Sequence, residues 1–93
     1  MAYFATIGLS SRHRKTLAAV FEDPARANVR WREIERLFEG LGAEISEGRG
    51  SRVRVALGTA RAVFHRPHPQ PTTDKGALKS VRKFLLASGA LDS

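Results

Sequence analysis

The spacing of apolar residues predicts two helices in the first half of the chain. Ser10 and Ser11 come before apolar residues at helical spacing, which predicts a serine-capped helix over residues 11–22 that ends before a proline. A second helix is predicted between a cap at Asn28 and a left-handed C-terminal position at Gly42. The apolar side of this second helix consists of Trp31, Ile34, Leu37, Phe38 and Leu41. Because the tryptophan continues that apolar side, we expect it to anchor the core and not to stack on a ligand.

From residue 43 to residue 65 the apolar period shortens to two, which predicts strands. The three predicted strands are AEISE, SRVRVAL and ARAVFH. A turn at Gly48-Arg49-Gly50 joins the first two, and Gly58-Thr59, with the glycine first, has the pattern of a type II′ hairpin between the last two. One face of the sheet is predicted to carry Val53, Val55, Leu57, Ala62 and Phe64. The opposite face is predicted to carry Arg52, Arg54, Ala56, Arg61, Val63 and His65.

The segment RPHPQP cannot extend a sheet, because its three prolines lack backbone N–H donors, and it is predicted to run over the surface as a stiff connection. A last helix follows, capped by Thr73 or Asp74 and closed by Gly89. Its inward side is predicted to carry Leu78, Val81, Phe84 and Leu85. Its opposite side carries a basic stripe of Lys75, Lys79, Arg82 and Lys83.

These elements predict an α+β fold in which three antiparallel strands form a sheet with helices on one face. The predicted order is α-α-β-β-β-α, and the 93 residues fit one domain over residues 10–93, with its core at 29–91 and an extra N-terminal helix. Two alternatives stay open for residues 1–9, a flexible segment or an addition that comes from an upstream start codon. These residues lack the basic leader of a signal peptide and are too few to span a membrane. No predicted element is available to cover the arginine face of the sheet.

The net charge of +7 lies almost entirely in the second half of the chain. Residues 1–47 hold seven basic and seven acidic residues, whereas residues 48–83 hold nine basic residues and one acid, Asp74. A localised excess of this kind favours a polyanionic partner, and we favour nucleic acid over charge that serves solubility alone. A membrane surface is disfavoured because no helix pairs a basic face with a wide exposed apolar one. The absence of cysteine excludes disulfides and thiolate metal sites and fits a reducing cytoplasm.

The histidines carry the candidate chemistry, because nucleotide-cradling, G-x-S-x-G and HExxH motifs are all missing. His13 lies at a helix start, where a solvated role is expected. His65 and His68 lie at the edge of the basic sheet, where a zinc site has weak support because neither cysteine nor acid is near. Imidazoles and an arginine suit metal-independent RNA cleavage, in which a base activates the 2′-hydroxyl, an acid protonates the leaving oxygen and a cation stabilises the phosphate. The residues by themselves favour simple phosphate contact over cleavage, and both hypotheses stay open.

Three segments in order, WREIERLFEGLGAEISEGRGSRVRV, VFHRPHPQP and DKGALKSVRKFLLASGAL, resemble the HicA toxin family of bacterial toxin-antitoxin modules. The resemblance runs from about Trp31 to Leu91, and the preceding SSRHRKTLAAVFEDP resembles an N-terminal extension found in a subset of the family. It implies a fold like that of double-stranded-RNA-binding domains, of order α-β-β-β-α. It also implies an mRNA-cleaving endoribonuclease that needs no metal or ribosome, and a HicB antitoxin that masks the active surface in a larger hetero-oligomer.

One departure from the family concerns its catalytic residue. The family's usual Gly-Ser-His is Gly50-Ser51-Arg52 in this chain, and an arginine is a poor general base because it stays protonated near neutral pH. His68 matches the family's Pro-His element, so we expect His68 to act as the base, His65 as the acid and Arg52 as the stabilising cation. The residues expected to contact RNA are Arg49, Ser51, Arg54, Arg61, Arg66, Lys75 and Lys79. No metal ligand and no cofactor are expected.

Three hypotheses about function therefore remain open. The first is a HicA-like ribonuclease toxin that a HicB-like antitoxin neutralises. The second is a catalytically silent RNA-binding domain of the same fold. The third is a protein-interaction module whose basic face docks an acidic antitoxin and never meets RNA.

Overall fold

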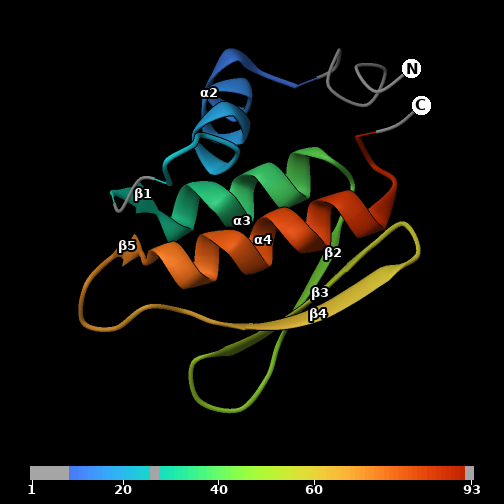
Figure 1. Cartoon of the computed structure of the whole chain (residues 1–93). Coiled ribbons are helices and arrows are strands. Elements are labelled where there is room, and N and C mark those ends of the chain that lie inside the picture. The colour runs from blue at the N-terminus through green and yellow to red at the C-terminus, as the bar shows by residue number, and fades with distance from the viewer. Residues whose placement is uncertain (1–8, 26–27, 92–93) are drawn as a thin grey trace.

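The computed structural model describes residues 9–25 and 28–91, and these form three helices and five strands (Figure 1). In chain order the elements are α2 (Ser11–Val20), β1 (Val29–Arg30), α3 (Trp31–Gly40), β2 (Glu44–Glu47), β3 (Arg52–Leu57), β4 (Ala60–His65), β5 (Thr72–Thr73) and α4 (Lys75–Ser88). No helix in this described part of the chain is long and apolar enough to cross a membrane.

The predicted three-stranded sheet is confirmed, with strand order β2-β3-β4 and antiparallel pairing throughout. Val53 pairs with Phe64 and Val55 with Ala62, so that the apolar residues of neighbouring strands share one face. Two residues, Gly58 and Thr59, connect β3 to β4. Gly58 has a φ of 57° and no described residue other than glycine has a positive φ, which fits the predicted type II′ turn and not a type I′ turn.

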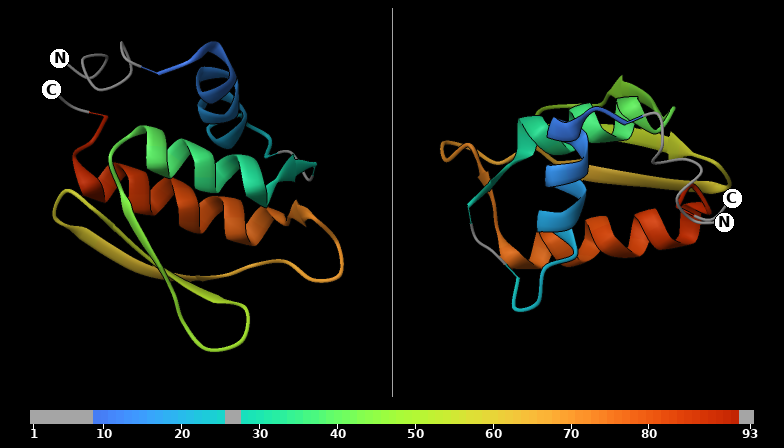
Figure 2. Two further views of the ribbon diagram at one scale, coloured as in Figure 1. Left: turned by 180° about the vertical axis from the view of Figure 1, so that it is seen from behind. Right: turned by 90° about the horizontal axis from the view of Figure 1, so that it is seen from above.

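The fold has three layers (Figures 1 and 2). Helices α3 and α4 lie side by side against one face of the three-stranded sheet, which we call the inner face. Helix α2 packs on α3 and α4 on their far side from the sheet. The opposite face of the sheet, which we call the outer face, is covered by no described element. The α+β fold class with helices on one face of an antiparallel sheet is therefore confirmed.

The core lies between the two middle helices and the inner face. Trp31 is 4% exposed and its ring centroid lies 5.5 Å from that of Phe64, which confirms its predicted role as an anchor. Phe38 and Phe84 complete the aromatic cluster, with Phe64 stacked 5.7 Å from Phe38 and edge-on 5.6 Å from Phe84. Such pairs contribute about 0.5–1.5 kcal/mol each beyond their buried area. The cluster joins both helices to β4.

Two of the three predicted N-terminal helix caps are confirmed. Ser10 Oγ accepts a hydrogen bond from the backbone N–H of His13 at 3.2 Å, and Asp74 Oδ1 accepts one from Ala77 at 2.7 Å. The prediction of an Asn28 cap was wrong, because α3 begins at Trp31 and no side chain caps it. Val29–Arg30 pairs instead with Thr72–Thr73 as a short two-stranded sheet, which keeps the chain extended up to the start of α3.

Two further predictions need correction at the N-terminal end. Helix α2 ends at Val20 and not at residue 22. The predicted flexible segment over residues 1–9 falls mostly on residues 1–8, which lie outside the described residues, but Leu9 is only 3% exposed. Its carbonyl oxygen accepts hydrogen bonds from Nε and Nη2 of Arg14 at 3.3 and 3.2 Å. Leu9 thus belongs to the core. The sequence did not predict this, because a single leucine beside a segment without clear apolar periodicity does not indicate burial.

Candidate nucleic-acid interface

The outer face of the sheet carries three cross-strand pairs of outward side chains on β3 and β4. Arg52 lies opposite His65, Arg54 opposite Val63, and Ala56 opposite Arg61. The period-two pattern predicted this orientation, and all of these side chains except the half-buried Ala56 are exposed. The register adds which residues are neighbours: the only imidazole on the described strands, that of His65, stands directly across from Arg52.

A polar hollow opens at the end of the outer face next to the β2–β3 loop. It is lined by Gly48, Arg49, Arg52, Arg54, Val63 and His65. Within the described residues, no ion pair or side-chain hydrogen bond occupies the guanidinium groups that line it, nor that of Arg61 farther along β4. Unpaired guanidinium groups around one imidazole form a site that suits a phosphate, since arginine binds phosphate oxygens with two parallel N–H donors.

The β2–β3 loop that borders this hollow is held by backbone hydrogen bonds. Gly48 donates to the carbonyl of Arg52 at 2.9 Å, and Arg52 donates to that of Arg49 at 3.0 Å. Gly50 has a φ of 60°, in the left-handed region that glycine adopts without strain. The carbonyl of Ser51 accepts a hydrogen bond of 2.8 Å from the backbone N–H of Arg66, beyond the end of β4. The Gly-Ser-Arg segment is therefore tied to the strand that carries His65.

Arg66, one of the predicted RNA contacts, binds two carboxylates of its own chain. Its Nε and Nη2 donate to Glu35 at 2.7 and 3.1 Å, and its Nη1 and Nη2 donate to Glu47 at 2.5 and 2.9 Å. These hydrogen bonds raise the pKa of the Arg66 guanidinium, and the largest contribution comes from Glu35. In return, the hydrogen bond from Arg66 lowers the pKa of Glu47. Four hydrogen bonds use most of the five N–H donors of this side chain.

The carboxylate of Glu35 also accepts a hydrogen bond from Nε1 of Trp31. Glu35 therefore satisfies the indole N–H of the buried tryptophan and the guanidinium of Arg66 at the same time. This network links α3 to the ends of β2 and β4, next to the loop that borders the polar hollow. Arg66 thus stabilises the elements next to the polar hollow by binding carboxylates. The arginines of the outer face bind no carboxylate among the described residues.

The predicted basic stripe on α4 lies on another surface. Lys75, Lys79 and Lys83 are exposed on α4, the helix that covers the inner face. Arg82, also in the predicted stripe, donates from Nε and Nη2 to the backbone carbonyls of Val20 and Glu22 and so holds α4 to the C-terminal end of α2. The structure divides the predicted RNA contacts between the outer face and α4, a division that residue spacing along the chain does not reveal.

The three histidines have separate places in the fold. His65 lines the polar hollow. His68 is exposed in the connection between β4 and β5 and does not line that hollow. His13 is half-buried on α2, where a Cβ added to Gly40 would lie 2.6 Å from its Nδ1, so the predicted solvated position of His13 is only partly correct. Of the two imidazoles expected to be catalytic, that of His65 lies opposite Arg52 and that of His68 lies outside the polar hollow.

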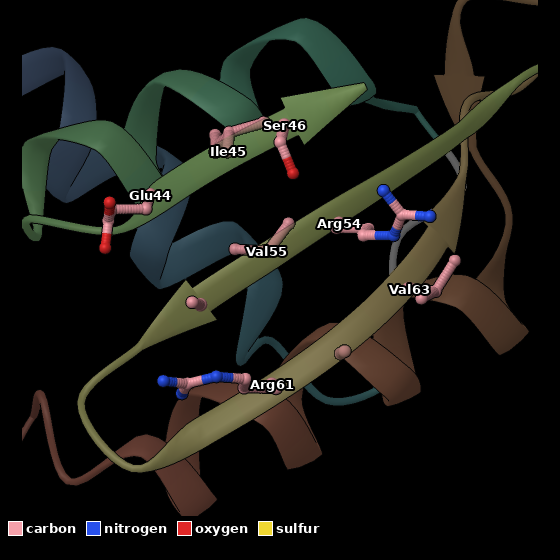
Figure 3. Close-up of a pocket in the computed structure, with 9 residues that line it drawn as sticks. Glu44, Ile45, Ser46, Arg54, Val55, Arg61 and Val63 are labelled. Atoms are coloured by element: carbon pink, nitrogen blue, oxygen red, sulfur yellow. The ribbon is translucent and has the colours of Figure 1, made fainter. Parts of the chain in front are cut away.

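A second hollow, more apolar, continues along the outer face (Figure 3). It is lined by Glu44, Ile45, Ser46, Arg54, Val55, Ala56, Arg61, Ala62 and Val63, and it shares Arg54 and Val63 with the polar hollow. Sequence reasoning did not identify it. The signal was present, because Ala56 and Val63 are apolar residues at outward positions of a basic face.

Among residues 9–25 and 28–91, no group of three or more His, Asp or Glu side chains could hold a metal ion. Comparison with protein families shows that the model of the HicA toxin of bacterial toxin-antitoxin systems aligns with residues 31–85, more than half of the chain. Searches of curated proteins and of solved structures gave no match. The matched range begins at α3 and ends within α4, and it includes both hollows of the outer face.

Proposed function

The chain belongs to the HicA toxin family of bacterial toxin-antitoxin systems, and from this premise we propose that it arrests growth by cleaving mRNA at its outer face. The observation that carries the proposal is the direct cross-strand pairing of Arg52 with His65, inside a hollow whose other cations are unpaired among the described residues. This arrangement provides a proton-transfer group and a phosphate-binding cation side by side. An mRNA substrate implies action in the cytoplasm.

The proposed reaction is metal-independent transfer of the phosphate to the neighbouring 2′-oxygen. A base removes the proton of the 2′-hydroxyl as its oxygen attacks phosphorus, an acid protonates the 5′-oxygen as the bond between that oxygen and phosphorus breaks, and a cyclic phosphate remains. Arg52 and its neighbours Arg49 and Arg54 stabilise the charge that builds on the non-bridging oxygens. His65 performs one of the two proton transfers, and His68 performs the other when the RNA reaches the β4–β5 connection.

The proposed antitoxin is a HicB-like protein that binds the outer face. Arg52, Arg54 and Arg61 project from that face, and a partner with acidic residues would neutralise them and shield the polar hollow. Binding by such a partner makes the stored form of the toxin a hetero-oligomer. The same arginines would then serve RNA and antitoxin in turn, which is why the two ligands are expected to exclude each other.

A second candidate is an RNA-binding domain that does not cleave. It is favoured by one specific observation, the replacement of the family's usual histidine by Arg52. Because a guanidinium does not accept a proton near neutral pH, this position offers affinity for phosphate without general-base chemistry. The third candidate, a module that only docks an antitoxin, predicts no RNA affinity at all.

Cleavage of a 5′-labelled mRNA in EDTA by the purified protein, free of antitoxin, separates the three candidates. The proposed function predicts cleavage by the wild type, with losses of about 100-fold or more for the catalytic imidazoles, as removal of an acid or base usually produces. His65→Ala and His68→Ala, each alone and together, report which imidazole transfers a proton. Arg52→His restores the family's residue and should speed cleavage, whereas Arg52→Ala should slow it.

His13→Ala is the matched control, because it removes an imidazole from α2, on the far side of α3 and α4 from the sheet. It should leave the cleavage rate unchanged, and thermal melts of all variants verify that they fold. RNA binding without cleavage by the wild type would select the silent domain. Absence of both would leave the docking module, and a folded double variant of His65 and His68 at the wild-type rate would refute the assignment of these residues.

A further inference from the structure

The second hollow of the outer face differs chemically from the polar hollow beside it. Along β3 and β4 the pairs follow in order: Arg52 with His65, Arg54 with Val63, and Ala56 with Arg61. The first pair lines the polar hollow, the last pair lines the second hollow, and the middle pair lines both. A hollow suited to phosphate and a more apolar hollow therefore lie next to each other along the same strand pair.

The floor of the second hollow is apolar although it lies within a basic face. Val63 is 54% exposed, one of two large apolar side chains that are this exposed in the described part of the chain. Ala56 adds a small side chain on the outer face, so nothing bulky fills the space between Arg54 and Arg61. Figure 3 shows these two arginines at opposite ends of the hollow and Glu44 on the neighbouring strand. An apolar floor between two guanidinium groups suits a flat ligand that carries negative charge beside it.

We infer that the second hollow binds a nucleobase of the RNA whose phosphate occupies the polar hollow, and that it favours bases with an exocyclic amino group. The inference rests on the proposed function, since it assigns the neighbouring nucleotide of the same substrate. A nucleotide joins a flat, largely apolar base to a phosphate, which matches the order of the two hollows. Bases of single-stranded RNA stack on apolar side chains and on arginine planes, and Arg54 and Arg61 supply such planes.

Glu44 gives the hollow its preference among bases. In the sheet Glu44 lies opposite Ala56, which in turn lies opposite Arg61, so a carboxylate and a guanidinium flank the alanine on the two neighbouring strands. A carboxylate repels phosphate but accepts hydrogen bonds from base N–H groups, as acidic side chains do from the amino group of cytosine. Adenine, cytosine and guanine present an amino group, whereas uracil presents carbonyl oxygens on both sides of its single N–H. Uracil is therefore the disfavoured base.

The experiment measures binding of single-stranded oligouridine probes in which one central nucleotide is uridine, adenosine, cytidine or guanosine. The 2′-oxygens are methylated, so that no probe is cleaved and binding is read by fluorescence anisotropy. The wild type should bind the three amino-bearing probes about tenfold more tightly than the all-uridine probe, the discrimination expected from one good base contact. Glu44→Gln should reduce this ratio to about two, because an amide donates as well as accepts hydrogen bonds.

Two further variants complete the experiment. Ala56→Leu fills the hollow without changing any charge and should bring the amino-bearing probes to the affinity of oligouridine. Glu39→Gln makes the same charge change as Glu44→Gln at an exposed position of α3, away from the outer face, and should keep the tenfold ratio.

Equal binding of all four probes by the wild type would overturn the inference and leave the proposed function standing. Absence of any binding would overturn both. A base preference without cleavage of unmethylated RNA would support the inference and refute the ribonuclease. If Glu44→Gln and Ala56→Leu weakened only the binding of an antitoxin protein and left the base ratio unchanged, the hollow would be a protein contact, and the inference would fail.

Discussion

Nε of Arg66 lies 2.7 Å from Oε2 of Glu35, which joins the residue after β4 to the middle of α3. Side chains of both residues are partly buried, 33% and 20% exposed, and Trp31 shares the same carboxylate. Since Glu47 is held by the same guanidinium, one arginine connects α3, β2 and β4. The basic residue nearest to the predicted catalytic histidines in sequence thus acts mainly within the fold.

The first prediction is that Arg66→Ala destabilises the protein by about 1–3 kcal/mol, the cost of leaving a partly buried polar group without its partner. Arg36→Ala is the control, because Arg36 and Glu33 form only a long pair of 3.8 Å on the surface of α3, and such pairs contribute about 0.5 kcal/mol or less. Urea denaturation of both variants gives the free energies of unfolding. Equal losses would show that the Arg66 network is no stronger than a surface pair.

The second prediction concerns acid. Arg66 lowers the pKa of Glu47 below its ordinary value of 4.5, so the folded state favours the ionised carboxylate. A carboxylate whose pKa is lower in the folded than in the unfolded state stabilises the fold at pH values above its unfolded-state pKa. This stabilisation is lost as the pH falls through its folded-state pKa. The wild type should therefore be more stable than Glu47→Gln at neutral pH, and the difference should shrink steadily below pH 4.5. Denaturation of both proteins across that range measures it, and a difference that grew in acid would contradict the assignment.

The third prediction compares two glycines with similar backbone angles. Gly58 and Gly50 have φ values of 57° and 60°, so alanine at either position meets left-handed strain of about 1–2 kcal/mol. A Cβ at Gly58 would also lie 2.2 Å from the carbonyl oxygen of Ser88, whereas nothing lies within 4 Å of one at Gly50. Gly58→Ala should therefore lose about 1–3 kcal/mol more than Gly50→Ala, the usual cost of overpacking. Equal melting temperatures would show that the turn does not press on the end of α4.

The fourth prediction tests the two faces of the sheet with one substitution. Val55 is 2% exposed and Val63 is 54% exposed. Val55→Asp should cost several kcal/mol, about 3 or more, because it buries an unpaired charge. Val63→Asp, on the outer face, should change the free energy of unfolding by about 0.5 kcal/mol or less. Similar stability for Val55→Asp and wild type would contradict the assignment of inner and outer faces.

The fifth prediction concerns affinity for RNA. Arg54→Glu should weaken binding and flatten the dependence of log K on log salt by about 0.7 for each phosphate contact that is lost on a single strand. Lys83→Glu makes a similar change of charge on α4, away from the outer face, and should leave that slope nearly unchanged. An unchanged slope for Arg54→Glu would remove the outer face from the RNA site. A changed slope for Lys83→Glu would extend the site onto α4.

Local pattern was sufficient for much of the fold and for part of the site. Alternation of arginine and valine placed Arg52 and Arg54 outward and Val53 and Val55 inward, because successive side chains of a strand point to opposite faces. Ser10 and Asp74 are confirmed as caps, since a short polar side chain before a helix reaches its first free N–H groups. These features depend on neighbours within a few residues, which a sequence displays directly.

The β1–β5 pair was missed because its strands are two residues long and far apart in sequence, with Val29 paired to Thr73, 44 positions later. A segment of that length has no detectable period. The roles of Arg66 and Arg82 were missed for a related reason. The sequence placed both residues on a basic surface. Only the packing of distant elements brings carboxylates to Arg66 and a backbone carbonyl of α2 to Arg82.

By itself, the sequence determined which side chains each strand and helix turns toward water, and where the positive charge collects, because both follow from local geometry and composition. The tertiary structure decided which of those charges are free. Strand register set His65 against Arg52, and helix packing turned Arg66 and Arg82 toward partners far along the chain. A guanidinium behaves as a ligand for phosphate or as an internal tie according to what lies within hydrogen-bonding distance, and that distance is established only when the core closes.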